Sequence, residues 1–560
     1  MNAQIKRFKY NAIVLVCIIG FYSCGEDFLT QYPKDKVVAA NFYKSDADFE
    51  AAINGVYDAY VWYQRGEFFP MQDMCTPFAN GGGGRYSVYK YGKIGLSSTW
   101  NMAAQWWELL YLAIFRANVV LENADKKDSE VSEAIRNRVK GEAYFLRAYS
   151  YFHLAYLYGD VPLILGPQQY EDLLVVRTPK NEVVKQIISD LSIAENLLPS
   201  VKTYRGTKNL GRASKGAAKS LLGKVYVFEK RWKEATDKLI EVIQSGDYEL
   251  TPNYSDMFWP TGENGIESIF EHQYEVDDPD KNANYYSVHC GFSNESNYGW
   301  YTGFDYINPV QNFVDKFETT AGYAVASTFV RRNNTSPYPT FVYDYSCSDP
   351  NFKKDEPFKN RDPRLKWTVW YEDTPYIQEF EQRTGQSGVN YKSRYSKESN
   401  YNTVKYITGR FDKQNNNSMN TISIRYADIL LLYAEAQIEQ NDLPEAIKYI
   451  NMVRKRPSVN MPTVEEISMV QNMNLTTNKE NLMNYLREER YRELAFEYGH
   501  MYYDQVRWDV LADEQVKYWT ANKEGFNNPA LTSFSKDYYL FPIPNDERIK
   551  NSNLTQNPGY

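Results

Sequence analysis

The chain has 560 residues and a formal net charge of −8 at pH 7, with 49 tyrosines and 11 tryptophans. This length allows one large domain or two to four smaller ones, and the core needs no disulfide or metal to hold it. This net negative charge argues against nucleic-acid binding, because proteins that bind nucleic acids usually carry an excess of basic residues. Five irregularly spaced cysteines argue against a disulfide scaffold, and the four histidines form no metal-binding pair.

The N-terminus carries a predicted secretory signal. Three basic residues precede an apolar run at 12–21, which is too short to span a bilayer. The run ends on F-Y-S-C, which places a small residue directly before Cys24, as in the lipobox of bacterial lipoproteins. Phe21 is unusual three positions before such a cysteine. An ordinary signal peptide with an incidental cysteine is the alternative.

Helical patterns dominate the next part of the chain. Ser45 and Asp48 form a capping-box pattern, and apolar residues at helical spacing follow it. Longer helices are predicted at about 101–124, 131–158 and 180–198. The helix at 131–158 is apolar around most of its circumference, so we expect it to be buried.

A helical repeat is predicted at two places. The first carries the spacing of a tetratricopeptide repeat at Leu222, Gly223, Tyr226 and Ala235. We expect Gly223 to let two helices approach closely and Ala235 to fit between them. A weaker copy carries Leu430, Ala434, Ala446 and Ile450. These patterns predict a mainly α fold, with a tetratricopeptide-like α-solenoid scaffold over about 45–250 and 420–510.

A long insertion at about 250–420 divides this scaffold. It is dense in Tyr, Asn, Pro, Ser and Gly, and it has few helical patterns. A loop of this length inside a compact protein is either functional or disordered, and the high aromatic content argues against disorder. We therefore expect an irregular, loop-rich insertion with a functional role.

The C-terminal region holds two further stretches. Residues 486–511 place apolar residues at helical spacing among charged ones, which predicts one long buried helix. Residues 539–560 contain Pro542, Pro544 and Pro558, each of which fixes φ. We expect this end to be an extended tail that is docked on the body.

Ordered motifs along the chain resemble the SusD/RagB family of outer-membrane nutrient-binding lipoproteins. They are C-G-E-D-F-L-T-Q-Y-P-K-D (24–35), E-A-Y-F-L-R-A-Y-S-Y-F-H-L-A-Y-L-Y-G-D-V-P-L-I (142–164), N-P-V-Q-N-F-V-D-K-F-E (308–318), R-D-P-R-L (361–365), R-Y-A-D-I-L-L-L-Y-A-E-A (425–436), and the stretches at 486–508 and 539–560. The chain departs from the family pattern E-G-x-R at Tyr498, Gly499 and His500.

The resemblance implies both an organisation and a function. It implies a signal peptide at 1–23, acylation of Cys24, and a single SusD-like domain at 24–560 whose extended tail is 511–560. The acidic residues that follow Cys24 resemble a surface-export signal. The implied protein is a glycan-binding lipoprotein of the outer membrane, facing the cell exterior. It would deliver oligo- or polysaccharide to a SusC-like TonB-dependent transporter, above which it would sit as a lid.

Two loop regions offer residues suited to sugar binding, and they match the regions that form the glycan face in the family. Sugar C–H faces stack on Trp or Tyr, while Asn, Asp and Arg bind hydroxyl groups. The first region supplies Asn80, Arg85, Tyr86, Tyr89, Trp100 and Asn101. The second supplies Tyr298, Trp300, Tyr301 and Asp305. For any single aromatic residue here, core packing is the alternative. Trp106, Trp107 and Trp508 lie inside helical patterns, so we expect them to be core or partner-interface residues rather than sugar platforms.

No catalytic motif accompanies these residues. The glycines at 81–84 are followed by Arg85 and Tyr86 rather than by Lys and Ser or Thr, so they form no P-loop. No cofactor is expected. The acidic run at 277–280 could supply oxygen ligands to calcium, although a solvated loop is the favoured interpretation. Two alternatives stay open: a repeat scaffold that binds proteins or peptides, and a glycoside hydrolase, which needs two carboxylates about 5–10 Å apart.

Overall fold

Helices form most of this protein, as the sequence predicts. The computed structural model describes residues 42–60, 72–81, 98, 101–126, 130–168, 173–274, 307–333, 340–371, 382, 399–406, 419–521 and 534–560. Among them, no helix is both long and apolar enough to cross a bilayer.

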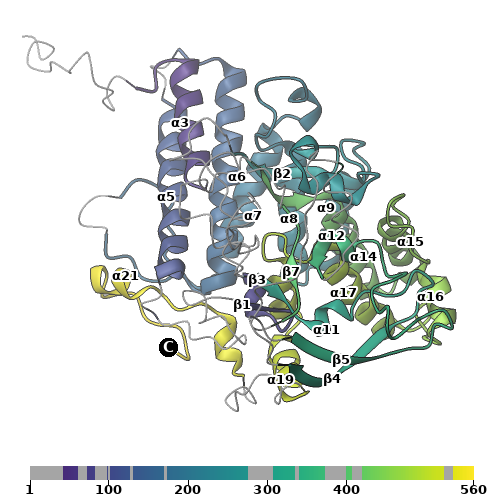
Figure 1. The fold of residues 1–560 in the computed structure, drawn as a ribbon. Coiled ribbons are helices and arrows are strands. Elements are labelled where there is room, and N and C mark those ends of the chain that lie inside the picture. The colour runs from purple at the N-terminus through teal and green to yellow at the C-terminus, as the bar shows by residue number, and fades with distance from the viewer. Residues whose placement is uncertain are drawn as a thin grey trace, which may run out of the picture.

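Neighbouring helices pack in sequence order to form the scaffold. These are α3 (Asp46–Asp58), α5 (Asn101–Ala124), α6 (Glu133–Tyr158), α7 (Lys180–Leu197), α8 (Lys215–Phe228), α9 (Trp232–Ile243), α14 (Tyr426–Glu439), α15 (Leu443–Arg454), α16 (Val464–Val470) and α17 (Lys479–Leu494). Helices α5, α6 and α7 stand side by side, and α3 packs on α5 and α6 (Figure 1). Because α9 packs directly on α14, the helical array continues across the chain segment that separates them.

The start of α3 shows how a local sequence signal sets a helix boundary. The Ser45 backbone N–H donates to the Asp48 carboxylate at 2.9 Å, and the Asp48 N–H donates to the Ser45 hydroxyl at 3.4 Å. This is the predicted capping box, which satisfies N–H groups that have no partner within the helix. Phe49, Ile53 and Val56 then face the core.

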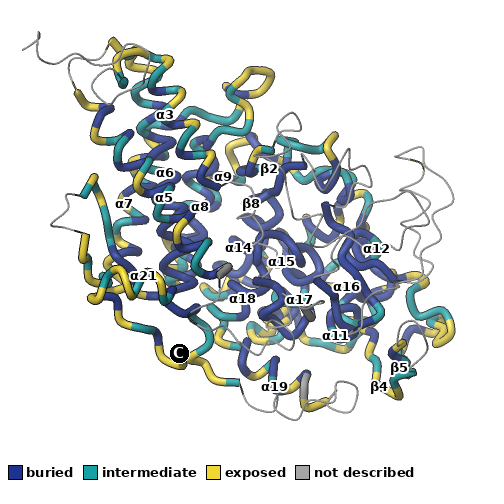
Figure 2. Tube along the Cα trace, turned by 60° about the vertical axis from the view of Figure 1, so that its left-hand side comes forward, coloured by how far each residue is buried: buried dark blue, intermediate teal, exposed yellow. Residues whose placement is uncertain are grey.

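Helix α6 lies at the centre of the core, as predicted. Nearly every residue from Arg138 to the end of the helix at Tyr158 is buried, whichever way its side chain points. Trp106 and Trp107, predicted to be core or partner-interface residues, are buried in the core, and Trp107 packs edge-on against Tyr158 at 5.1 Å between ring centroids. Figure 2 shows this buried interior continuing through α8, α14 and α17.

The predicted close approach of α8 and α9 is confirmed. A Cβ added at Gly223 would lie 2.6 Å from Cγ of Leu239, so a side chain at this position would have to displace Leu239 of α9. Ala235 is fully buried beside this contact. The equivalent positions in α14 and α15, Leu430 and Ala446, are buried too.

The prediction of one long helix over 486–511 is wrong. Helix α17 ends at Leu494, and α18 (His500–Arg507) and α19 (Leu511–Ala521) follow as separate helices. The carbonyl of Glu493, which a continuing helix would bond to the N–H of residue 497, accepts instead from the Tyr254 hydroxyl at 2.9 Å and Arg425 Nη2 at 2.7 Å. Left-handed backbone at Phe496, Tyr498 and Gly499 turns the chain.

The described strands form two-stranded antiparallel pairs. They are β1 (Ala79–Gly81) with β3 (Ile307–Pro309), β2 (Ser268–His272) with β8 (Thr421–Arg425), β4 (Val325–Asn333) with β5 (Thr340–Cys347), and β6 (Val369–Trp370) with β7 (Asn402–Thr403). The described α-helices of the insertion, α11 (Gln311–Val314) and α12 (Leu365–Thr368), span four residues each. The β4–β5 hairpin projects at the lower right of Figure 1.

The C-terminal tail is docked on the end of α6. The Phe541 N–H donates to the Leu157 carbonyl at 2.7 Å, and Asn557 Nδ2 donates to the Tyr158 carbonyl at 2.9 Å. Phe541 and Ile543 are fully buried. The region 511–560 is only partly extended, since it contains α19 and the short helix α21 (Asn545–Lys550).

Candidate functional site

The two loop regions chosen from the sequence meet at the β1–β3 pair. Strand β1 leads into the first region, and β3 follows directly after the second. In the antiparallel register, Gly81 at the end of β1 lies opposite Ile307 at the start of β3, and Asn80 lies opposite Asn308. The chain therefore leaves toward residue 82 and returns from residue 306 at the same end of one small sheet.

This sheet rests on a buried aromatic base. The Val310 N–H donates to the Phe78 carbonyl at 3.0 Å, which extends the pairing by one step. Phe78 is fully buried and contacts Tyr491 of α17 at 4.7 Å between ring centroids. Asn308 Nδ2 donates to Asn402 Oδ1 at 2.8 Å and so ties β3 to β7. The bases of both loops are thus fixed to rigid elements, which is how binding loops are usually positioned.

Two of the predicted glycan-binding residues lie among the described residues. Asn80 lies in β1, and Asn101 is the first residue of α5. The others lie outside the described residues: Arg85, Tyr86, Tyr89, Trp100, Tyr298, Trp300, Tyr301 and Asp305. The predicted lipidation site Cys24 and the acidic run at 277–280 lie outside them as well. In the described part of the chain, no group of three or more His, Cys, Asp and Glu side chains is placed to hold a metal ion.

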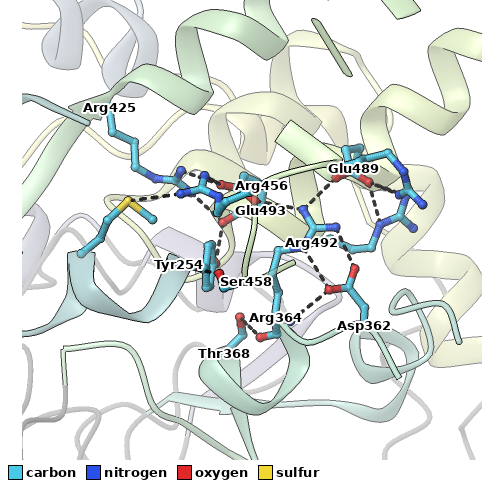
Figure 3. Close-up of polar contacts among 12 residues, drawn as sticks. Tyr254, Asp362, Arg364, Thr368, Arg425, Arg456, Ser458, Glu489, Arg492 and Glu493 are labelled. Carbon is cyan, nitrogen blue, oxygen red and sulfur yellow. Dashed lines mark hydrogen bonds and ion pairs between the residues drawn. The ribbon is translucent and has the colours of Figure 1, made fainter. Parts of the chain in front are cut away.

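Helix α17, which contacts Phe78 through Tyr491, carries a buried network of charged side chains (Figure 3). Glu493 accepts from Arg364 Nη1 at 2.9 Å, Arg425 Nη1 at 2.7 Å and Arg456 Nη2 at 2.6 Å. One turn earlier, Glu489 accepts from Arg364 Nη1 and from Arg454 Nη1, each at 2.7 Å. Both carboxylates are completely buried.

The guanidinium groups keep these carboxylates ionised. Burial alone would raise the pKa of Glu493, but Arg456, Arg425 and Arg364 outweigh it and lower that pKa to about 2. Burial likewise opposes ionisation of Glu489, and again the neighbouring arginines prevail and hold its pKa well below the ordinary value.

The network contains equal numbers of acidic and basic groups. Its basic members are Arg364, Lys405, Arg425, Arg454, Arg456 and Arg492, and its acidic members are Glu267, Glu318, Asp362, Glu489, Glu493 and Glu497. Such a balance lets charges remain buried, because each one has a partner of opposite sign. These residues come from the insertion, from the end of β8, from the end of α15 and the turn after it, and from α17 and the turn after it. The network therefore fastens the insertion to the scaffold.

A second balanced cluster joins four helices. Arg490 of α17 donates through Nε to Asp504 of α18 at 2.7 Å and through Nη2 to Asp428 of α14 at 2.8 Å. Lys224 of α8 donates to Asp428 at 3.0 Å. Because Glu489, Arg490, Arg492 and Glu493 of the α17 motif lie in these buried clusters, we assign them to the support of the structure rather than to contact with a ligand.

One further surface feature was not predicted from the sequence. A pocket of about 640 Å³ lies between the second half of α3, the loop before α8 and the end of β2. Its walls include Tyr57, Arg212 and Gln273. These residues lie in three segments that are far apart in the chain, and no spacing rule connects them.

Comparison with known proteins adds to this geometry. Residues 266–560, more than half of the chain, match the profile of the SusD family. The chain belongs to the SusD family. Residues 27–227 match a further SusD-like profile, described as starch-binding and associating with the outer membrane. The resemblance inferred from the motifs is therefore confirmed.

SusD-like relatives match along nearly the whole chain. A SusD-like protein of Formosa agariphila is 26% identical over 590 residues, which cover 98% of this chain and 99% of the relative. A SusD-like carbohydrate-binding protein of Bacteroides fragilis has 24% identity and a TM-score of 0.71, and the match covers 92% of this chain and all of that one. A laminarin-binding SusD-like protein has 23% identity and a TM-score of 0.67, with the same coverage. These structures establish the SusD-like fold of the chain.

Proposed function

We propose that this chain is a cell-surface lipoprotein that captures oligo- or polysaccharide and delivers it to a SusC-like TonB-dependent transporter. The observation that supports this most directly is the β1–β3 pairing, because it gives the two aromatic-rich loop regions a common rigid base. Family membership adds support, since one structural neighbour is named for binding carbohydrate and another for binding laminarin.

In this proposal the protein binds sugar without breaking bonds. Trp100 and Trp300 offer flat faces for the apolar side of sugar rings, together with Tyr86, Tyr89, Tyr298 and Tyr301. Asn80, Arg85, Asn101 and Asp305 hydrogen-bond the hydroxyl groups. The short strands and the buried base reduce the entropy lost when the loops bind, which favours affinity.

The site is tested by affinity electrophoresis and calorimetry of the purified protein against a panel that includes laminarin and starch. We expect retarded mobility with at least one glycan and no released sugar. Trp100→Ala and Trp300→Ala should each weaken binding by about tenfold or more, because a stacked ring that leaves water contributes roughly 1.5–3 kcal/mol. Phe115→Ala is the matched control, since Phe115 is an aromatic residue on the outside of α5 that is 54% exposed.

Three outcomes would contradict the proposal. Unchanged affinity in both tryptophan variants would remove these residues from the site. Release of sugar products would make the protein a glycoside hydrolase. Capture of peptides without any glycan binding would favour a repeat scaffold that recognises proteins.

The proposed membrane anchor is tested separately. Acyl chains on Cys24 would hold the mature protein on the outer membrane, at about 0.8 kcal/mol per buried CH₂ group. Cys24→Ala should abolish incorporation of labelled palmitate and release the protein from the membrane fraction. The anchored wild-type protein should co-purify with a TonB-dependent transporter, and its absence from all transporter complexes would refute the proposed partner.

A further inference from the structure

The pocket beside α3 lies apart from the proposed loop site. It is bounded by the second half of α3 and by residues 271–274 at the end of β2. Figure 1 shows β2 in the upper part of the molecule, clearly separated from β1 and β3. A ligand in this pocket would therefore be held by a different set of residues from those that flank the β1–β3 sheet.

The walls of the pocket resemble a sugar subsite in their chemistry. Tyr57 and Tyr274 are partly exposed and provide aromatic surface. Asn54 is exposed, and its Oδ1 accepts from Arg212 Nη2 at 2.7 Å, which among the described residues leaves the amide nitrogen for a ligand. Gln273 is positioned by reciprocal bonds with Asn264, at 2.9 and 3.0 Å between the amide nitrogen and oxygen atoms. Rings beside oriented amides suit a ligand with both an apolar face and hydroxyl groups.

Most charges at the pocket are neutralised by neighbouring groups. Arg212 donates to Glu142 and to Glu50, each at 3.0 Å. The same two glutamates also bind Arg138, so this group contains two positive and two negative charges.

The two acidic residues that line the pocket, Asp58 and Glu271, are also engaged. Asp58 pairs with Arg116 at 2.9 Å. Glu271 is 3% exposed and accepts from the Asn264 N–H at 2.8 Å and from Asn420 Nδ2 at 3.0 Å.

Lys208 is the exception. It lines the pocket, is exposed, and makes no ion pair or hydrogen bond among the residues that the structure describes. Its ammonium group is therefore a positive charge that has no partner in the described part of the chain, at the rim of a polar, aromatic-walled pocket. A ligand with a negative charge would supply that partner, in a charge-assisted hydrogen bond.

We propose that this pocket is a second saccharide site, which takes a sugar unit carrying an anionic group, either a carboxylate or a sulfate ester. Lys208 pairs with the anionic group, the tyrosine rings contact the sugar face, and the amide nitrogen of Asn54 donates to a hydroxyl group. The ligand class rests on the proposed function, but the site uses none of the loop residues.

Calorimetry of the purified protein tests this site with three probes: an oligogalacturonate, its methyl-esterified form and a sulfated galactan oligosaccharide. Lys208→Ala should weaken binding of a charged probe about tenfold and leave binding of the uncharged ester unchanged. Lys517→Ala is the matched control, because Lys517 on α19 is also exposed and without a partner in the described structure. Asn54→Trp places a large ring in the pocket and should abolish binding there. The charged probe that responds to Lys208→Ala identifies the anionic group as carboxylate or sulfate.

Equal affinity of the Lys208→Ala and Lys517→Ala variants for both charged probes would overturn the proposal, as would failure of the parent protein to bind either charged probe. Trp100→Ala and Trp300→Ala separate this outcome from the proposed function. If they abolish all glycan binding and Lys208→Ala changes nothing, the pocket proposal alone fails. If they change nothing and Lys208→Ala weakens the charged probe, the loop site fails and the pocket stands.

Discussion

Removing one buried charge from α17 should destabilise the protein strongly. The change is Glu493→Gln, which keeps the shape of the side chain but leaves Arg364, Arg425 and Arg456 with one fewer anion. The pKa of Glu493 falls from 4.5 to about 2 on folding. At about 1.4 kcal/mol per pKa unit, the ionised form contributes about 3 kcal/mol at neutral pH. Breaking a buried ion pair costs a similar amount, about 3–5 kcal/mol.

The same helix provides the matched control. Glu488 pairs with Lys316 at 2.7 Å, but its side chain is 34% exposed. Glu488→Gln should therefore cost no more than about 1 kcal/mol, because water solvates and screens an exposed pair. The two variants differ in burial and in the number of partners, while both remove one negative charge from α17.

Urea unfolding, followed by tryptophan fluorescence and by far-UV circular dichroism, gives the two free-energy changes. Coincident transitions by both probes validate the two-state treatment. Because the pKa is lowered on folding, the contribution of Glu493 is present above pH 4.5 and declines as the pH falls toward 2. A loss of stability in Glu493→Gln no larger than that in Glu488→Gln would refute the reasoning.

Three further predictions concern packing, pH and the tail. Gly223→Ala should raise the unfolding rate and lower the free energy of unfolding by about 1–3 kcal/mol, because the added Cβ would overlap Leu239. Gly55→Ala is the control: this position has open space around it, so the variant should be neutral or stabilising in thermal melts. Burial lowers the pKa of His272 from 6.5 to about 3, so below pH 6.5 the unfolded chain binds a proton that the folded chain does not. The free energy of unfolding should therefore fall by about 2 kcal/mol between pH 6.5 and 5. His272→Gln should remove this part of the pH dependence of stability. Asn557→Ala should lower the free energy of unfolding by about 2 kcal/mol, because Asn557 Nδ2 donates to the carbonyls of Tyr158 and Phe541. The variant should also expose the C-terminal tail to limited proteolysis, and a tail as resistant as that of the wild type would contradict this.

Local signals made much of the helical fold predictable. The capping box at Ser45 and Asp48 sets the start of α3, and the periodic apolar pattern sets α5, α6 and α7 to within two residues at either end. Gly223 predicted a close contact between two helices, because a glycine inside a helix leaves room for a neighbouring helix to approach. Each of these signals acts within a few residues of the chain.

The helix break after Leu494 lies beyond the reach of such signals. Its cause is long-range, since Tyr254 and Arg425 bind a carbonyl that a helix would have used. Gly499 was the one local indication, and its neighbours Phe496 and Tyr498 adopt left-handed backbone without being glycine. The pocket at Lys208 was unpredictable for the same reason, because its residues come together only after folding.

The β1–β3 pairing has a consequence for how such proteins diversify. Main-chain hydrogen bonds hold this pair, and they do not depend on which side chains the strands carry. The segments that leave from Gly81 and arrive at Ile307 can therefore change in length and sequence without disturbing the helices beneath. Exchanging those segments between relatives should therefore transfer ligand preference to the recipient protein. The melting temperature should stay that of the recipient, because the helical scaffold is unchanged.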